Sequence, residues 1–493
     1  MKTFFARLFA KKIHRKNQKW IANPHQAQEK TFNFLLKTAQ NTQFGKDHNF
    51  KKIENYQDFK AQVPVRNYEG LRPYVERILQ GEKDILWPGQ PLYLAKTSGT
   101  TSGAKFIPLT KASMPTHITA ARDALLNYIH ETGNTDFVTG KQIFLQGSPV
   151  LEKKKGIAFG RLSGIVAHYV PSYLQTNRMP SWETNCIEDW ETKVSAIVEE
   201  TVSEKMTLIA GIPSWVQMYF ERLKQRENKA VGDIFPHFSL FVYGGVNYKP
   251  YRALFEKLIG RKVDSVELFP ASEGFFAYQD RQNEEGLLLL LNNDIFYEFI
   301  EADTFFSDAP KRICLEEVVL GVNYVLILNT SAGLWGYNIG DTVQFVSKAP
   351  YRLIVSGRIK HFISAFGEHV IGKEVESALQ EAMAGTKASV REFTVAPQIA
   401  PQAGLPFHEW LIDFNVSPED PVAFAAALDT AMRSQNIYYD DLIRGNVLQP
   451  AVVTQVNKGA FEAYMKSIGK LGGQNKVPRL TNDRSIADEL VKH

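Results

Sequence analysis

A polar loop rich in serine, threonine and glycine lies within the segment KTSGTTSGAKFIPLT. Its glycines let the backbone approach a ligand closely, so several N–H groups can converge on an anion. The hydroxyl groups add hydrogen-bond donors, and the lysine adds a positive charge. This chemistry predicts a phosphate-binding loop, whose candidate residues are Thr97, Ser98, Gly99, Thr100, Thr101, Ser102, Gly103 and Lys105.

The loop does not match a Walker phosphate loop, which requires Gly-Lys followed by Ser or Thr. Here Gly103 is followed by Ala104, and Phe106 follows Lys105. A flexible Ser/Gly surface turn has the same composition. On this segment alone, both interpretations stay open.

A glutamate follows one of the apolar runs. Ser272 and Glu273 end the run SVELFPASE. A single glutamate in a loop is ordinarily a solvated charge. However, α/β sheets bind ligands beyond the carboxyl ends of their strands, which favours a role for Glu273 in a site.

The elements that must position these residues alternate between strand and helix. Strand-like runs occur at YLAKT, KQIFLQG, LIAGIP, LFVYGG, SVELFPASE, LLLLLNN, YVLILNT and RLIVSGR. Helical patterns separate several of them, for example PSWVQMYFERLKQRE and KPYRALFEKLIG. This alternation predicts an α/β fold with a mostly parallel, buried sheet.

The chain before the polar loop is predicted to be largely helical. In the segment PHQAQEKTFNFLLKTAQ, one helical face carries Phe32, Leu35, Leu36 and Ala39. Strands without long helices between them follow at 288–357, which predicts a separate β-rich layer or a barrel.

The character of the chain changes after SGRIKHFISAFGEHV. The segments GKEVESALQEAM, REFTVAP, HEWLIDFNV and PVAFAAALDTAMRSQ predict a small α+β domain. We therefore expect a large N-terminal domain over residues 1–357 and a small C-terminal domain over residues 358–493, with the boundary near Gly357–Lys360.

The composition limits the class of protein. The chain has 493 residues, 44% of them hydrophobic and 22% charged, as in a globular protein of more than one domain. The two cysteines, Cys186 and Cys314, favour a reducing compartment, so we expect a cytoplasmic location.

The net charge of +4 and the lack of a basic–aromatic stripe argue against nucleic-acid binding. No apolar run reaches the ~18 residues that a membrane span needs.

The N-terminal segment MKTFFARLFAKKIHRKNQKW has seven Lys/Arg residues and no acidic residue. Its apolar stretch is short and interrupted by Arg7, and it lacks a small-residue cleavage site, so it does not fit a signal peptide. A solvated amphipathic helix that caps the domain is the interpretation we favour. A membrane-surface anchor is the alternative.

Six segments, taken in order, resemble the adenylate-forming superfamily of acyl-CoA synthetases, peptide-synthetase adenylation domains and luciferases. They are TSGTTSGAKFIPLT, VYGGVNYKPYRALFEKLIG, ELFPASEG, GYNIGDTVQF, SGRIKHFISAFGEHVIGKEVESAL and GGQNKVPRL. The spellings SGTTSGAK, ASEG and above all GGQNKVPRL are similar to the Gretchen Hagen family of auxin-responsive acyl acid-amido synthetases, which has bacterial members. The resemblance to this bacterial type covers essentially the whole chain.

The resemblance implies a large N-terminal domain of mixed β-sheets with a β-barrel flanked by helices, and a small, mobile α+β C-terminal domain. It implies a monomeric enzyme that uses ATP and Mg²⁺. A carboxylic acid and ATP would give an acyl-adenylate and pyrophosphate. An amine, usually an amino acid, would then displace AMP to form an amide.

The resemblance also assigns roles on the phosphate side of the site. The polar loop would hold the β- and γ-phosphates, although many superfamily members have two residues where this chain has only Ala104 before Lys105. Glu273 would be catalytic as a ligand of Mg²⁺, a hard cation that takes carboxylate and phosphate oxygens.

The nucleoside side of the site is implied in the same way. Phe269 would stack on adenine where the family usually has a tyrosine. Asp341 would accept hydrogen bonds from both ribose hydroxyls, and Arg358 would contact ribose or phosphate. The other implied nucleotide-binding residues are Gly244, Gly245, Val246, Ser272 and Tyr337.

Two lysines are implied to act with the small domain. Lys360 falls at the hinge, which absorbs the backbone change when that domain rotates. Lys476 would swing in with the domain and stabilise the transition state of adenylation, with Arg479 close by.

Two alternatives remain. An acyl-CoA-type ligase would make a thioester from the same acyl-adenylate, and a non-catalytic protein would only bind the nucleotide. The family-specific spellings favour the amide. The presence of Glu273, Asp341, Arg358 and Lys476 argues against the non-catalytic alternative. These motifs identify neither the acid nor the amine.

Overall fold

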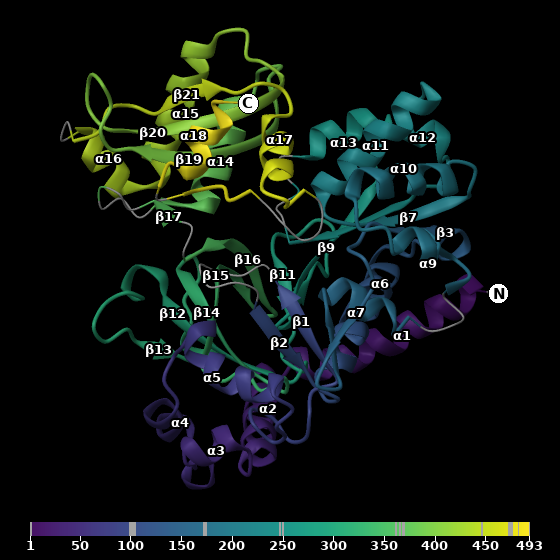
Figure 1. Cartoon of the computed structure of the whole chain (residues 1–493), viewed down its shortest axis with the longest axis vertical. Helices are drawn as coiled ribbons and strands as arrows, with labels where there is room; N and C mark the ends of the chain where they lie inside the picture. The colour runs from purple at the N-terminus through teal and green to yellow at the C-terminus, as the bar shows by residue number, and fades with distance from the viewer. Residues whose placement is uncertain are drawn as a thin grey trace.

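The fold consists of a large N-terminal body and a smaller C-terminal body stacked on it (Figure 1). The structure is a computed structural model. It describes residues 2–97, 105–170, 175–245, 248, 251–359, 362–363, 366, 370–444, 447–471, 477–481 and 483–492.

A twelve-stranded sheet runs through the large body. One half of it is parallel, and its central strands are apolar runs buried on both faces, as expected for strands covered by helices. Its strands, in spatial order, are β9 (Asp264–Ala271), β8 (Leu240–Gly244), β7 (Met206–Ala210), β3 (Lys141–Phe144) and β6 (Arg178–Met179).

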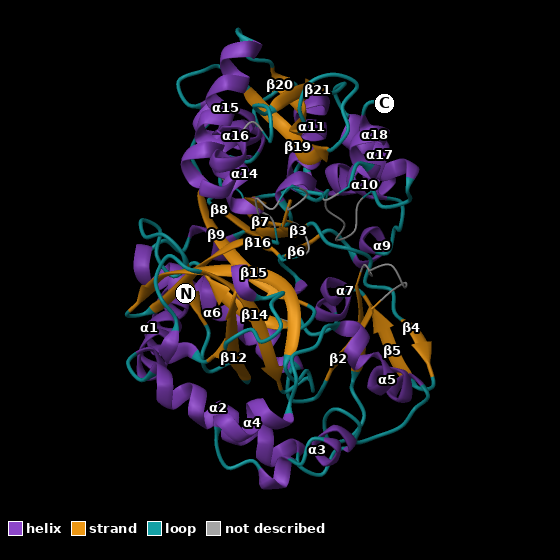
Figure 2. Cartoon of the chain, turned by 90° about the vertical axis from the view of Figure 1, so that its left-hand side faces the viewer, coloured by secondary structure: helices purple, strands orange, loops and turns teal. Residues whose placement is uncertain are grey.

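The other half of the sheet is antiparallel, so our expectation of a mostly parallel sheet was wrong. The chain reverses direction in a two-residue turn at Ser272 and Glu273, and the strands that follow pair antiparallel. The β-rich layer expected at 288–357 is therefore continuous with the parallel half. Its strands curve strongly (Figure 2), and their pairing within the described residues remains open at β13. In spatial order they are β13 (Arg312–Ile313), β12 (Ile295–Glu301), β14 (Asn323–Thr330), β15 (Tyr337–Lys348), β16 (Tyr351–Arg358), β11 (Leu287–Leu289) and β10 (Gly274–Tyr278).

A second, four-stranded sheet carries the polar loop. Its strands are β2 (Lys105–Leu109), β1 (Tyr93–Thr97), β5 (Ile157–Gly160) and β4 (Glu152–Lys154). Strands β1 and β2 form a hairpin in which Thr97 lies opposite Lys105. The polar loop predicted from the sequence is therefore the connection at the end of this hairpin.

Helices cover both faces of the parallel strands. Neighbouring side chains along a strand point to opposite faces, and here both faces are apolar. Leu208 belongs to the core on the side of α6, and Ile209 belongs to the core on the side of α10 and α11. The helices of this region are α6 (Met114–Thr132), η2 (Asp136–Thr139), α7 (Leu162–Ala167), α9 (Trp182–Asn185), α10 (Trp190–Thr201), α11 (Pro213–Glu227), α12 (Val231–Ile234) and α13 (Arg252–Ile259).

The N-terminal segment is helical, as predicted. Phe32, Leu35, Leu36 and Ala39 are all buried and lie on one face of α2, which packs against β12. The helices are α1 (Lys2–Ile21), α2 (Pro24–Ala39), α3 (Gln43–Asp47), η1 (Phe50–Lys52), α4 (Tyr56–Gln62) and α5 (Tyr68–Leu79). Two further short helices, η4 (Ala302–Thr304) and η5 (Leu315–Glu317), interrupt the antiparallel half.

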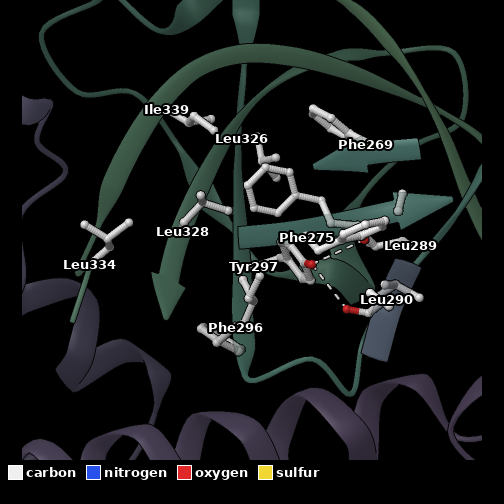
Figure 3. Close-up of a cluster of buried hydrophobic side chains, with 14 of the residues drawn as sticks. Phe269, Phe275, Leu289, Leu290, Phe296, Tyr297, Leu326, Leu328, Leu334 and Ile339 are labelled. Carbon is white, nitrogen blue, oxygen red and sulfur yellow. Dashed lines mark hydrogen bonds between the residues drawn. The ribbon is translucent and has the colours of Figure 1, made fainter. Parts of the chain in front are cut away.

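The main core lies under the curved strands, where aromatic and aliphatic side chains interdigitate (Figure 3). Tyr297 is fully buried there, and its hydroxyl donates to the carbonyl of Leu290 at 3.2 Å. Phe269, one of the predicted site residues, belongs to the same core.

The smaller body has its own sheet and core. Strands β19 (Ser389–Gln398), β20 (Phe407–Val416) and β21 (Val452–Gln455) pack against α14 (Gly372–Met383) and α15 (Pro421–Gln435) around a buried cluster that includes Trp410 and Leu428. The segments predicted as helices and strands of an α+β region are confirmed. The remaining elements are β17 (Phe362–Ile363), β18 (Val370–Ile371), α16 (Ile437–Arg444), α17 (Ala460–Ser467) and α18 (Ser485–Leu490). The boundary at residues 357 and 358 stays a prediction.

Candidate active site

Glu273 lies in the tight turn where the parallel half of the sheet ends. Ala271 on β9 and Gly274 on β10 are paired across the turn, and Ser272 and Glu273 connect them. The side chain of Glu273 is only 9% exposed. Burial raises the pKa of Glu273, and the positive charge of Lys105 opposes that shift. A buried carboxylate at the carboxyl edge of β9 is therefore held close to a cation from the loop hairpin.

Tyr337 is the hydrogen-bond donor to this carboxylate. It begins β15, is fully buried, and its hydroxyl lies 3.4 Å from Oε1 of Glu273. Burial and then the charge of Glu273 raise the pKa of Tyr337, so the hydroxyl stays protonated and can donate. The N-terminal segment holds the start of β15 in place, because the N–H of Asn338 donates to the carbonyl of Arg66 at 2.8 Å.

The same N-terminal segment positions the base of the polar loop. The backbone N–H of Phe106 donates to the hydroxyl of Tyr68 at 2.9 Å, and Nζ of Lys105 lies 5.8 Å from the centre of the Tyr68 ring. Tyr68 is therefore a site residue that sequence reasoning missed. No motif indicated this role, because Tyr68 lies outside the segments that carry the recognised motifs.

Asp341 and Arg358 form the second polar group of the site. They are directly opposite each other on β15 and β16, and Nε of Arg358 lies 2.6 Å from Oδ1 of Asp341. The charge of Asp341 raises the pKa of Arg358. The sequence predicted separate contacts of both residues with the nucleotide, whereas here they contact each other. A carboxylate has further acceptor sites, so Asp341 can still receive a ribose hydroxyl.

The glycine pair at the end of β8 is required by close packing. A Cβ atom on Gly244 would lie 2.5 Å from the carbonyl oxygen of Leu268, and Gly245 has φ +78°. The backbone can therefore pass close beside β9. Phe269, by contrast, is 6% exposed and packs edge-to-face on Phe276 at 5.0 Å. Its stacking on adenine stays a prediction.

Several predicted residues lie outside the described residues, and their roles also stay predictions. Of the loop, only Thr97 and Lys105 are described, and they face each other across the hairpin. The predicted residues outside the description are Ser98, Gly99, Thr100, Thr101, Ser102, Gly103, Val246, Lys360 and Lys476.

The chain just after Lys476 is anchored in the smaller body by Arg479. Its guanidinium contacts the carboxylate of Glu392, lies 3.5 Å from that of Glu376, and stacks 4.6 Å from the centre of the Phe393 ring. Burial opposes the charge, but the two carboxylates raise the pKa of Arg479. The described residues just after Lys476 are thus tied to β19 and α14 by a largely buried ion network.

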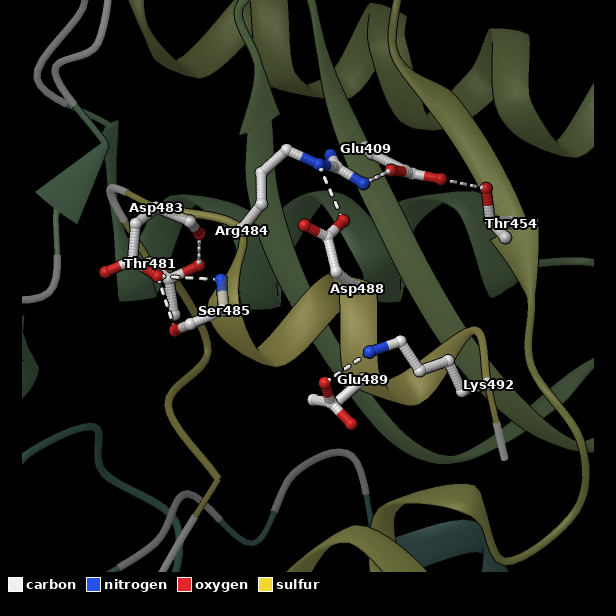
Figure 4. Close-up of polar contacts among 9 residues, drawn as sticks. All are labelled: Glu409, Thr454, Thr481, Asp483, Arg484, Ser485, Asp488, Glu489 and Lys492. Atoms are coloured by element: carbon white, nitrogen blue, oxygen red, sulfur yellow. Dashed lines mark hydrogen bonds and ion pairs between the residues drawn. The ribbon is translucent and has the colours of Figure 1, made fainter.

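A second polar network anchors the end of the chain (Figure 4). Nη2 of Arg484 lies 2.7 Å from Glu409 on β20, and Nε lies 3.0 Å from Asp488 on α18. Thr454 on β21 donates to the same Glu409 at 2.6 Å. The segment on the far side of Arg479 is therefore also fixed to the sheet.

The smaller body contacts the helices that cover the parallel strands. Lys466 on α17 lies 2.9 Å from Glu191 on α10, and Arg391 on β19 lies 3.3 Å from Glu221 on α11. These are pairs of polar and charged side chains rather than an apolar interface. Such contacts suit two bodies that change their relative orientation.

A half-buried cation with no acidic partner among the described residues lies near the carboxyl end of β3. Arg178 on β6 donates to Oε1 of Gln146 at 2.9 Å and stacks over the ring of Phe144. Burial lowers the pKa of Arg178 to about 10. Among the described residues no carboxylate pairs with it, and Nε of Arg178 and Nε2 of Gln146 are buried without a hydrogen-bond partner. No sequence pattern indicated this group, because β6 has only two residues.

A metal site made entirely of protein side chains is not found among the described residues. Mg²⁺ keeps several waters and binds through one or two carboxylates plus substrate phosphates, so its binding by Glu273 stays a prediction. Glu273 supplies one buried carboxylate whose proton affinity is raised by burial, next to the predicted phosphate loop.

Comparison with protein families identifies the chain. It matches the GH3 family N-terminal domain over residues 14–183, the central domain over 288–358 and the C-terminal domain over 373–485. The chain belongs to the GH3 family. The resemblance of its motifs to this family is thereby confirmed, whereas the bacterial type stays a prediction.

Two curated relatives match over nearly their whole length. The chain is 21% identical to indole-3-acetic acid-amido synthetase GH3.3 of Arabidopsis thaliana, over 94% of the chain and 90% of the relative. It is 22% identical to jasmonoyl–L-amino acid synthetase GH3.5 of Oryza sativa subsp. japonica, over 86% of the chain and 87% of the relative.

The fold matches a solved structure of the same family. The GH3.15 acyl acid amido synthetase superimposes with a TM-score of 0.80 at 14% identity, covering 97% of this chain and 95% of that one. This likeness confirms a large body of sheets and helices with a smaller C-terminal body. No described helix is long and apolar enough to cross a membrane.

Proposed function

We propose that this GH3 chain is an AMP-forming ligase that joins a carboxylic acid to an amino acid through an acyl-adenylate. The observation that carries the proposal is the convergence of Lys105, Glu273 and Tyr337 at the carboxyl edge of β9. The family membership supports it, and both curated relatives are named as synthetases of amido or amino acid conjugates.

The first step overcomes the poor leaving group of a carboxylate. A carboxylate oxygen of the acid attacks the α-phosphorus of ATP, the bond to the β-phosphate breaks, and pyrophosphate leaves with its electron pair. The enzyme must align these groups and neutralise the charge that develops. The hairpin loop ending at Lys105 would hold the leaving phosphates.

Glu273 would hold Mg²⁺, with Ser272 beside it in the turn. A bound Mg²⁺ supplies charge neutralisation on the phosphate oxygens. Tyr337 fixes the rotamer of the carboxylate through its hydrogen bond of 3.4 Å. Because this carboxylate is buried, it must lose its proton before it can act, and the positive charge of Lys105 favours that loss.

The nucleoside would lie between β8 and the pair on β15 and β16. Asp341 would accept hydrogen bonds from the ribose hydroxyls, and Arg358 would orient the carboxylate of Asp341. The side chain of Arg358 is 53% exposed and faces solvent. The adenine would lie beside Gly244 and Gly245 at the end of β8, where Gly245 has a φ of +78°.

The second step needs a site for the amine. The nitrogen attacks the acyl carbon, the bond to the AMP oxygen breaks, and the amine loses a proton. We assign the carboxylate of the acceptor to Arg178 and Gln146, since a half-buried guanidinium that has a buried, unpartnered Nε and no acidic partner among the described residues suits an incoming carboxylate. Rotation about Lys360 would change the position of Lys476 between the steps.

Pyrophosphate release from Mg²⁺–ATP tests the proposal. The protein is incubated with a library of carboxylic acids, each alone, with a mixture of amino acids, or with CoA, and products are identified by mass spectrometry. Acid-dependent release that yields an amide supports the proposal. Release that yields only a thioester with CoA assigns the chain to the alternative ligase. Pyrophosphate release that does not depend on any acid contradicts both the amide-forming and the thioester-forming ligase. A cytoplasmic location and a monomeric state stay predictions.

A further inference from the structure

The outer end of α1 exposes a cluster of large apolar side chains. Phe4, Phe5, Leu8 and Phe9 are 63%, 62%, 51% and 41% exposed, respectively. Their spacing at i, i+1, i+4 and i+5 places them together on two successive turns of the helix. In Figure 1, α1 runs to the periphery of the molecule, and its N-terminus lies at the edge. We name Phe4, Phe5, Leu8 and Phe9 the apolar tip.

A row of cations continues the same helical face behind the apolar tip. Four of these residues follow the tip residues at the i+7 and i+8 spacing of a helix face. None of the described ion pairs involves a residue of α1, and Asp123, the acid near Lys16, is already paired with Arg122. We name this row the basic stripe; it consists of Lys11, Lys12, Arg15, Lys16 and Lys19.

The opposite face of α1 holds the helix in place. Ala10, Ile13, Asn17 and Trp20 are buried, and the helix packs along α6. Nη2 of Arg7 also donates to the carbonyl of Gly133 at 3.1 Å. The capping helix expected from the sequence is therefore present. Outside the capping face, the guanidinium of Arg122 lies 5.7 Å from the centre of the Phe9 ring, and the apolar tip and the basic stripe are otherwise exposed.

We propose that α1 docks the chain on an anionic lipid bilayer. The apolar tip would enter the interface between headgroups and acyl chains, and the basic stripe would lie along the anionic headgroups. The seven Lys/Arg residues and the lack of acids in the N-terminal segment give the charge complementarity. A nucleic acid would use the cations but would leave the three phenylalanines and the leucine in water. A lipid surface accommodates both features.

Vesicle co-sedimentation of the full chain tests the proposal. The probes are phosphatidylcholine vesicles with and without phosphatidylglycerol. We expect binding that requires phosphatidylglycerol and falls about tenfold or more when Phe4, Phe5 and Leu8 are replaced by Ser. Replacement of Lys11, Lys12 and Arg15 by Gln should weaken binding about tenfold or more, and added salt should weaken it further. These side chains are exposed, so the variants should keep the wild-type melting temperature.

Matched variants elsewhere on the surface serve as controls. Phe306, Val319 and Leu320 are equally exposed apolar residues, and their replacement by Ser should leave vesicle binding unchanged. Lys224, Lys229 and Lys257, replaced by Gln, control for net charge. Pyrophosphate release in solution should be unaffected by all of these changes, so failure of the proposed function would be seen separately.

Three results would overturn the proposal. One is equal sedimentation with and without phosphatidylglycerol. Another is binding of a DNA duplex that depends on the basic stripe, with no vesicle binding. The third is a concentration-dependent dimer that disappears with the apolar tip, again without vesicle binding, which would make a second copy the occupant.

Discussion

The hydroxyl group of Tyr337 lies 3.4 Å from Oε1 of Glu273, a pair separated by 64 residues. One partner begins β15 in the antiparallel half of the sheet, and the other forms the turn at the end of the parallel half. Both side chains are buried, so the hydrogen bond is shielded from water. The pair joins the two halves of the sheet at the position where we place the phosphates.

Replacing Glu273 by Gln should abolish adenylation and stabilise the protein without ligands. The folded-state pKa of Glu273 is raised, so the folded protein loses stability as pH rises through that pKa. The variant should therefore melt at a higher temperature than the wild type at neutral pH. Below pH 4.5, the ordinary pKa of a glutamate in the unfolded chain, Glu273 is neutral, as Gln is. The difference in melting temperature between wild type and variant should therefore vanish there. Melting curves across pH measure this, and a variant that melts lower at neutral pH would contradict it.

Replacing Tyr337 by Phe should shift the acid limb of the adenylation pH profile to higher pH. The hydroxyl donates to the charged form of Glu273, so its loss raises the pKa of that carboxylate further. Tyr219 is an equally buried tyrosine whose hydroxyl bonds to Thr201 at 2.6 Å, away from the site. Its change to Phe should cost stability, about 1 kcal/mol, without moving the limb. Identical profiles for Tyr337→Phe and wild type would contradict the assigned role.

Replacing Asp341 by Asn should weaken ATP binding about tenfold or more, because a hydrogen bond to a charged acceptor is lost. The wild type should prefer ATP over a dideoxy analogue that lacks both ribose hydroxyls, and the variant should lose that preference. The melting temperature should barely change, because Arg358 is 53% exposed and such a pair contributes only about 0–1 kcal/mol. Calorimetric titration with both nucleotides tests this. A preference retained in the variant would place the ribose elsewhere.

Replacing Arg479 by Met should destabilise the smaller body by about 3–5 kcal/mol, because Glu392 and Glu376 lose the guanidinium that neutralises them. Hydrogen exchange should increase in β19 and α14 and remain unchanged in α2. Adding Glu392→Gln should restore part of the protection. If Glu392→Gln increases hydrogen exchange further instead, the ion network around Arg479 does not act as we describe.

Replacing Arg178 by Met should raise the KM for the amino acid about tenfold or more, since a charge-assisted bond is lost. Trapping of the acyl-adenylate by hydroxylamine, which has no carboxylate, should be unchanged. Arg122 also stacks on a phenylalanine, Phe9, but is paired with Asp123, so Arg122→Met is the matched control. Equal effects on both acceptors would give Arg178 a structural role instead.

Much of this arrangement could be predicted because it depends on local patterns. The helix over Pro213–Glu227 and the buried face of α2 follow from hydrophobic periodicity. The positions of Lys105, Glu273 and Asp341 follow from motifs that span only a few residues each. These motifs could be recognised without knowing the three-dimensional path of the chain.

The remainder depends on contacts between distant segments. The two-residue turn at Ser272 and Glu273 reverses the strand direction, and an apolar run does not reveal the direction of its partner. The pairing of Asp341 with Arg358 depends on a register that includes bulges. Arg178 was missed because nothing in its local sequence shows that its Nε is buried without a hydrogen-bond partner.

The most direct test of the central claim follows an oxygen atom. Carboxylic acids that support pyrophosphate release are labelled with heavy oxygen in both carboxylate positions, and the reaction is run to completion with amino acids. If the carboxylate attacks the α-phosphate, each AMP should carry one heavy oxygen and the amide should retain the other. Unlabelled AMP, or label found in inorganic phosphate together with ADP, would contradict an acyl-adenylate and with it the proposed function.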